Sequence, residues 1–392
     1  MSGMKITSVL LILAGLLCLP RAASAETATA KSTDPNPQAK KLAETVSLIT
    51  GVAISPLMGV GAVGAYDWVK AKTPEEKAAL PWFANPLFWG PALLLVGACF
   101  LKDTAGIAIP TVLKKPFDVA EACEHKISGL VATAAFVPIA ASIFHAPDQP
   151  GASLASLGFA AIDLHWLYNA LMVPVAMVMF FIVFLASNAI NMLILLSPFA
   201  TVDAALKGFR TTILVSVAGT SFANPWAGGL WALVIFLFSW LIAGWSFRLS
   251  HFGLSFIWDF ITGRKSRFHP DAKENKMFLG AKCQKVPTRT YGKLLLNEKG
   301  EILFRYRPWL VLPPRTIILP PGTYETGRGL FYSEIMRAEG DSLKTIILLP
   351  PRYLGHEAEV ARIYNFAGAR DVGIRAGWAW FKSLFGGRRV AA

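Results

Sequence analysis

The 392 residues are 54% hydrophobic and only 16% charged, and their mean hydropathy is +0.47. Because soluble domains have roughly 45–50% apolar residues, this composition disfavours an ordinary soluble protein and indicates an integral membrane protein. The formal net charge is +13, and residues 263–392, with 23 Lys/Arg and 11 Asp/Glu, contribute +12 of it. The apolar runs precede residue 260, so the sequence predicts a nearly neutral membrane part followed by a basic domain.

The N-terminus has the pattern of a secretory signal. Lys5 precedes an apolar run, and Ala23-Ser24-Ala25 has the small residues of a cleavage site. Residues 1–25 are therefore predicted to be a signal peptide. Residues 26–43, rich in Thr, Ala, Pro and Lys, are predicted to be a disordered leader.

Residues 44–262 are predicted to form an α-helical polytopic membrane domain with four to six spans. A span needs about 20 apolar residues, and four stretches qualify: Trp82–Leu101, Ile127–Phe144, Trp166–Leu196 and Trp226–Phe247. An earlier stretch, Val46–Ala65, contains Pro56 and several glycines, so we expect it to be broken or re-entrant. Two further apolar pieces, Ala105–Leu113 and Thr211–Ala223, are too short to cross and are expected to be half-spans.

Two polar segments beside the short pieces resemble each other. Both Pro116–Ala122 and Pro198–Ala204 start with Pro-Phe and have an acidic residue before a short helix that carries Lys. An internal repeat of the kind that many transporters use would explain the match. Chance similarity between two helix starts would explain it too, because Pro and acidic residues are favoured there.

The basic residues 263–392 are predicted to form a small β-rich (α+β) extramembrane domain. A hairpin is expected from Lys293–Leu296 and Ile302–Tyr306 around Asn297–Gly300. Further strands are expected at Trp309–Leu312, Thr316–Leu319, Leu330–Arg337 and Lys344–Leu349, a helix at His356–Phe366, and a final amphipathic helix at Ile374–Phe385. The outline, a small sheet or barrel closed by a helix, is loosely similar to a pleckstrin-homology-like module.

The orientation follows from the positive-inside rule. Arg248, Arg264, Lys265 and Arg267 come directly after the last predicted span, which favours a cytoplasmic C-terminal domain in the bacterial inner membrane. If Val46–Ala65 crosses as well as the four spans, the loop between His145 and His165 lies inside. This loop has no Lys or Arg, so it opposes that orientation. A basic domain beside a bilayer indicates contact with anionic lipid headgroups through Arg264, Lys265, Arg267, Arg375 and Lys382. No nucleic-acid module is recognisable, so nucleic acid is not an expected partner.

The best cluster of reactive side chains comes before the span at Ile127. On a helix Asp118, Glu121 and His125 share a face, an arrangement that suits an ion, proton or solute site. A solvated helix start, with acids favoured by the helix dipole, explains the same residues. Asp203, Lys207 and Arg210 form a second polar group, in which Asp203 and Lys207 have the spacing of an i,i+4 pair.

Asn188 and Asn191 lie inside the long span Trp166–Leu196. At that depth an amide side chain needs a partner, and hydrogen bonding between helices explains the two asparagines better than a transport site does. The pairs Gly59/Gly61 and Gly228/Gly229 are likewise expected to serve close helix packing.

No nucleophile motif, phosphate-binding glycine loop or HExxH motif is present, so no enzymatic activity is predicted. The four cysteines show no CxxC spacing, and neither a disulfide framework nor a metal site is predicted from them. No cofactor is expected.

Four short motifs in residues 45–250 resemble a family of bacterial inner-membrane proteins that is known only as a domain of unknown function. The motifs are Phe100-Leu101-Lys102-Asp103 with Gly106, the passage from Asp118 to Ala132, Lys207-Gly208-Phe209-Arg210, and Ala223-Asn224-Pro225. Residues 104–117 depart from the family pattern, and the C-terminal domain lies outside it. The resemblance implies a membrane fold and no mechanism.

Two functions are compatible with these features. The first is a non-enzymatic, multi-pass membrane anchor that positions the basic domain, in envelope organisation or beside a protein partner. The second is a small-solute or ion transporter with its site near Asp118, Glu121 and His125. Few ionisable residues lie in the predicted spans, and this favours the first function.

Overall fold

The computed structural model describes residues 37–105, 125–135, 165–197, 200–329, 331–340 and 342–373. The signal peptide, the helix at Ile374–Phe385, and the residues Asp118, Glu121, Arg375 and Lys382 lie outside these ranges. So does the first copy of the suggested repeat, Pro116–Ala122, and the repeat therefore stays a prediction.

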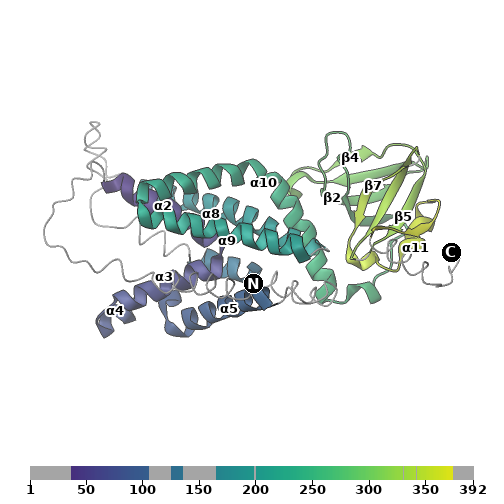
Figure 1. The fold of residues 1–392 in the computed structure, drawn as a ribbon. Coiled ribbons are helices and arrows are strands. Elements are labelled where there is room, and N and C mark those ends of the chain that lie inside the picture. The colour runs from purple at the N-terminus through teal and green to yellow at the C-terminus, as the bar shows by residue number, and fades with distance from the viewer. Residues whose placement is uncertain are drawn as a thin grey trace, which may run out of the picture. The chain divides into compact units, whose positions relative to one another are not determined.

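The N-terminal region is helical and is followed by a mixed eight-stranded sheet domain, as Figure 1 shows. Its helices are α2 (Pro37–Ile54), α3 (Pro56–Lys70), α4 (Pro74–Ala78), η2 (Trp82–Ala84), α5 (Pro86–Ala105), α8 (His165–Leu196), α9 (Ala200–Ala223), α10 (Pro225–Ile261) and η4 (Arg264–Ser266). Residues 125–135 are also helical. α2 begins at Pro37, inside the segment expected to be a disordered leader.

Two of the described helices are long and apolar enough to cross a membrane, Val173–Leu196 in α8 and Pro225–Ile261 in α10. In α5 the apolar stretch with described side chains is Pro86–Gly97, and the predicted span Trp82–Leu101 extends beyond it. The stretch Val46–Ala65 is broken as expected, because α2 ends at Ile54 and Pro56 starts α3. The predicted span Ile127–Phe144 extends beyond the described residues.

Two helix predictions need correction. The last span was expected to end at Phe247, but α10 continues to Ile261 because Leu249, Phe252 and Phe256 keep a buried face through the polar residues. Thr211–Ala223 was expected to be a separate short piece. It is the second half of α9, which starts at Ala200, so the polar segment before it is helical too.

The sheet domain contains β1 (Glu274–Leu279), β2 (Tyr291–Leu296), β3 (Ile302–Tyr306), η5 (Pro308–Leu310), β4 (Arg315–Ile318), β5 (Tyr324–Arg328), β6 (Ser333–Glu339), β7 (Ser342–Leu349), η6 (Pro351–Tyr353), α11 (Glu357–Ile363) and β8 (Ala369–Asp371). The strand order is β4-β3-β2-β1-β7-β6-β5-β8, and all neighbours are antiparallel except β5 and β8. α11 lies beside β5 (Figure 1). One sheet face supplies a buried core that includes Met277, Leu294, Phe304, Ile335 and Ile347.

The predicted hairpin is confirmed, with Leu296 opposite Ile302. The expected strand at Trp309–Leu312 is wrong, because η5 occupies Pro308–Leu310 and both Trp309 and Leu310 have positive φ. The strands β1, β5 and β8 were not predicted, since their sequences are polar or very short.

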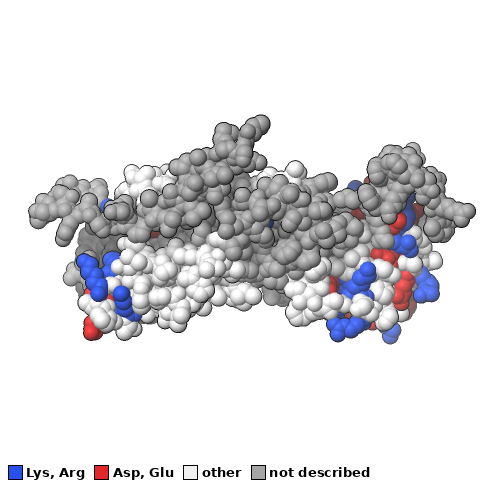
Figure 2. Space-filling view, turned by 60° about the horizontal axis from the view of Figure 1, so that its bottom comes forward, with Lys and Arg blue, Asp and Glu red and all other residues white. Residues whose placement is uncertain are grey.

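The chain divides into two compact units. Met1–Leu101, Gly129–Val178 and Ser216–Leu233 form one, and Lys102–Ser128, Met179–Val215 and Val234–Ala392 form the other. The second unit therefore contains the sheet domain together with the C-terminal part of α10. In Figure 2 most of the described helical surface is white, whereas the sheet domain carries both blue and red residues.

Candidate anion-binding site

Three cations lie side by side on the face of the sheet opposite the core. Lys276 of β1 is the register partner of Lys293 in β2, and Lys293 is the register partner of Arg305 in β3. Like charges directly opposite each other on neighbouring strands are destabilising. The arrangement is therefore costly for the fold, and an anion on this face would offset the cost.

Glu274 provides part of the compensation. Lys293 Nζ lies 2.5 Å from Glu274 Oε1, and Arg305 Nη2 lies 3.0 Å from Glu274 Oε2. The hydrogen bond from Lys293 lowers the pKa of the Glu274 carboxyl. Glu274 is the one acidic residue within β1, β2 and β3. With Arg307, which follows β3, four cations lie on or directly after these strands, near the carboxylates of Glu274 and Asp271, so positive charge is in excess.

A pocket of about 660 Å³ opens beside this row of cations. Its lining includes Lys293, Arg305 and Arg307, together with Tyr306 and with His251 from α10. Ligand pockets usually have volumes of roughly 300–1,000 Å³ and combine apolar walls with a few polar groups. This pocket matches that description and could hold an anionic group of moderate size.

Aromatic contacts fix the α10 side of the pocket. The His251 ring lies edge-on to Tyr291, with centroids 4.8 Å apart, and 5.4 Å from the ring of Phe278. One helical position further along, Phe252 also packs on Phe278. Tyr291 also lines the pocket, and burial raises the pKa of its hydroxyl.

An exposed apolar loop borders the same pocket. Leu310 lines the pocket, while Trp309 is 53% and Val311 is 80% exposed. The Trp309 ring contacts Phe247 of α10 at a centroid distance of 5.1 Å. Trp309 and Leu310 have φ values of 53° and 66°. Such backbone conformations are strained for residues with side chains and are concentrated at functional sites.

Asn188 and Asn191 join helices. Asn188 Nδ2 donates to Ser250 Oγ at 2.7 Å, which links α8 to α10. Arg210 Nη1 donates to Asn191 Oδ1 at 2.7 Å, which links α9 to α8. Both contacts are hydrogen bonds between helices, as expected from the sequence.

The remaining predicted residues that the structure describes are absent from the pocket lining. His125 is buried and stacks on Phe184 at 5.4 Å, and Asp203 is fully buried in α9, with Lys207 one turn further along. Arg264, Lys265 and Arg267 are exposed in and just after η4, and Arg267 donates to the Thr262 carbonyl at 2.6 Å.

Comparison with known proteins adds no assignment: no family model, no curated protein and no solved structure matches the chain. The pocket residues Lys293, Arg305 and Arg307 were not predicted as a site. The predicted hairpin was enough to bring two of them together, because pairing Leu296 with Ile302 places Lys293 opposite Arg305.

Proposed function

We propose that this chain is a non-enzymatic, multi-pass inner-membrane protein whose helical part anchors the basic sheet domain, and that this domain binds anionic lipid headgroups. The observation that supports the proposal best is the excess of positive charge beside a pocket that α10 helps to line. Among the described residues α10 is one of two helices of membrane-crossing length, and its part from Val234 onward lies in the same unit as the pocket.

The apolar loop beside the pocket supports a location at the bilayer surface. Tryptophan is enriched where hydrocarbon meets water, and exposed Trp309 and Val311 would lie in that zone. Lysine or arginine near an anionic membrane surface contributes about 1 kcal/mol each. A headgroup phosphate in the pocket would neutralise the cation row, while the acyl chains contact the loop.

Lipid titration of the full chain tests this function. Purified protein in a neutral detergent is titrated with short-chain phosphatidylglycerol and, separately, with short-chain phosphatidylcholine. We expect tighter binding of the anionic lipid, and a loss of about 30-fold in its affinity for the double variant R305Q/R307Q, because two cations are removed.

The double variant R362Q/R370Q is the matched control. It removes the same charge from α11 and from β8, the strand at the other edge of the sheet. Its affinity for phosphatidylglycerol is expected to change by less than about threefold. Equal affinity for the two lipids, or equal losses in both double variants, would contradict the proposed site.

The proposed orientation places the sheet domain in the cytoplasm, because Arg264, Lys265 and Arg267 follow α10. An alkaline phosphatase or green fluorescent protein fused after Ala392 reports the side of the membrane. A fluorescent, phosphatase-negative fusion is expected. A phosphatase-active fusion would place the domain in the periplasm and contradict the proposed orientation.

A small-solute or ion transporter is the second candidate function. The observation in its favour is that Asp203 and His125 are buried in helices of the membrane part, where ionisable groups often mark solute pathways. The test is solute flux into proteoliposomes that contain the parent protein, one of the variants D118N, E121Q, H125A and D203N, or the control variant K344Q, which alters an exposed lysine. Flux that all four variants leave unchanged would contradict the site.

A further inference from the structure

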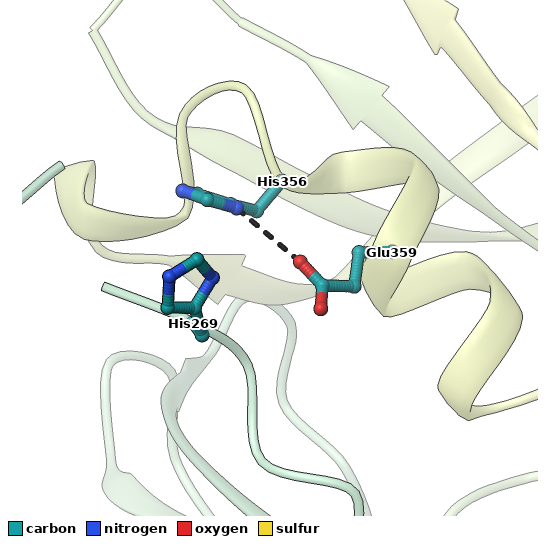
Figure 3. Close-up of side chains that lie close together, drawn as sticks. All are labelled: His269, His356 and Glu359. Carbon is teal, nitrogen blue, oxygen red and sulfur yellow. Dashed lines mark hydrogen bonds and ion pairs between the residues drawn. The ribbon is translucent and has the colours of Figure 1, made fainter. Parts of the chain in front are cut away.

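Three side chains of metal-ligand type converge at the start of α11. His269 comes from the segment after η4. His356 is the residue directly before α11, and Glu359 lies in the first turn of α11. One ligand atom from each lies within 4.8 Å of the other two. Figure 3 shows the three side chains pointing toward one another.

The spacing suits a tetrahedral ion. His356 Nδ1 lies 3.3 Å from Glu359 Oε2. With bonds of about 2.0–2.1 Å to a tetrahedral zinc ion, neighbouring ligand atoms are about 3.4 Å apart. Two of the three ligands are therefore already at the required separation. His269 is exposed on a non-helical segment, so its ring is able to turn toward the other two.

The hydrogen bonds of His356 supply an independent reason. Its Nε2 lies 3.2 Å from the carbonyl oxygen of Lys265, and its Nδ1 faces the Glu359 carboxylate. Both neighbours are acceptors, but a neutral imidazole has one N–H. If Nε2–H donates to the carbonyl, the Nδ1 lone pair faces a carboxylate oxygen. A second proton or a metal ion resolves that repulsion.

We propose that His269, His356 and Glu359 bind a divalent transition metal of the zinc class. Imidazole nitrogens favour zinc over the oxygen-seeking magnesium and calcium ions. Donation from the second ring nitrogen to a backbone carbonyl is the usual way in which a ligand histidine is oriented, and the Lys265 carbonyl fills that role for His356. Three protein ligands leave the fourth position for water or a further ligand.

The metal would connect two distant parts of the chain. His269 lies between the end of α10 and β1, and the other two ligands lie on α11. A bound ion would therefore fix the segment that leaves α10 against the start of α11. This role is separate from lipid binding, because none of the three ligands lines the pocket.

Zinc binding to the full chain tests the proposal. Protein without a histidine tag, stripped with a chelator and purified in detergent, is titrated with Zn²⁺ against a competing dye, and bound metal is counted by mass spectrometry. We expect one zinc per chain and a rise in Tm on zinc addition. H269A and E359Q should each weaken zinc binding by at least about 100-fold and remove most of the rise in Tm.

Two controls separate metal binding from other effects. E301Q removes an exposed carboxylate in the β2–β3 turn and should bind zinc like the parent protein, and Mg²⁺ should leave the Tm unchanged. H269A alters an exposed side chain, so it keeps the fold while it removes a ligand. Less than one zinc per chain, or equal affinity in H269A and the parent, would show that His356 and Glu359 form an ion pair without metal.

Discussion

Asn275 connects three segments of the sheet domain through its buried side-chain amide. Its Oδ1 accepts from the Asp271 amide at 3.0 Å and from the Tyr353 hydroxyl at 3.3 Å. Its Nδ2 donates to the Asp271 carbonyl at 2.6 Å and to the Tyr364 hydroxyl at 2.9 Å. One side chain thus joins β1 to η6 and to the end of α11. Loss of the amide leaves several buried groups without partners.

We expect N275A to lower the free energy of unfolding by roughly 2–3 kcal/mol, because buried polar groups that lose their partners cost about 1–3 kcal/mol. Y364F removes one hydroxyl and should cost about 1 kcal/mol. Denaturant unfolding of the full chain in detergent, followed by near-ultraviolet circular dichroism, measures both values. A smaller loss for N275A than for Y364F would contradict the assigned role of the amide.

The buried tyrosines predict a loss of stability in alkali. Burial raises the pKa of both Tyr324 and Tyr364 from the ordinary value of 10 to about 12. Between pH 10 and 12 the unfolded chain gives up these protons while the folded chain keeps them, so their contribution is complete below pH 10 and is lost as pH rises toward 12.

The measurement is the free energy of unfolding as a function of pH from 9 to 12. It should fall above pH 10 in the parent protein and fall less steeply in Y324F/Y364F, which has two fewer groups to ionise. An equal slope in the two proteins would show that these tyrosines do not titrate as proposed.

At the scale of elements, glycines allow helices to approach closely. A Cβ on Gly59 would lie 2.7 Å from Val52 Cα, and one on Gly229 would lie 2.7 Å from Ala43 Cα. Among the glycines of the described helices, Gly64 in α3 makes the closest approach to backbone, because a Cβ there would lie 2.2 Å from the carbonyl oxygen of Phe83 in η2. The expectation that these glycines serve helix packing is confirmed for Gly59, Gly228 and Gly229, since a Cβ on Gly228 would lie 2.5 Å from Ser221 Cα of α9.

We therefore expect G64A to lower the stability of the helical unit by roughly 1–3 kcal/mol, since the backbone must move to admit the methyl group. G51A is the matched control in α2. No atom lies within 4 Å of a Cβ at Gly51, so alanine should raise stability by about 0.5–1 kcal/mol. Thermal unfolding in detergent distinguishes them, and shifts of Tm in the same direction would contradict the packing argument.

The predictable elements are those with strong local signals. The break between α2 and α3 follows from Pro56, and the β2–β3 hairpin follows from its turn residues. The length of α10 was underestimated because Arg248 and His251 interrupt the apolar run, although helical periodicity continues past them. The strand predicted at Trp309–Leu312 was wrong because its apolar residues, typical of a buried strand, are exposed around η5. Composition alone does not show whether an apolar segment is buried.

The two sites differ in how far sequence predicts them. Lys293 and Arg305 are brought together by a local hairpin, so their pairing was accessible from the turn. His269 and His356 are far apart in the sequence, and their approach depends on the path of the chain between α10 and α11. Each is an isolated histidine in its own segment, which gives no metal-ligand spacing to recognise.

At the scale of the whole molecule, α10 is a helix of membrane-crossing length, and its part from Val234 onward belongs to the same unit as the sheet domain. Arg248 Nε donates to the Thr288 carbonyl at 3.0 Å. Near the C-terminal end of α10, Asp259 Oδ2 accepts from Arg352 Nε at 2.9 Å and from the Arg352 backbone amide at 3.2 Å. Both side chains of this ion pair are buried, so the pair is a buried polar connection between α10 and η6.

Removing one partner of this ion pair leaves the other charge buried. We expect D259A to lower the free energy of unfolding by about 3–5 kcal/mol. D259A/R352M should recover most of that loss, because methionine fills the space of Arg352 without a charge. In contrast, E325A breaks the exposed pair between Arg370 and Glu325 and should cost less than about 1 kcal/mol. Denaturant unfolding of the full chain measures all three, and a D259A loss no larger than the E325A loss would show that this pair does not hold α10 to the sheet domain.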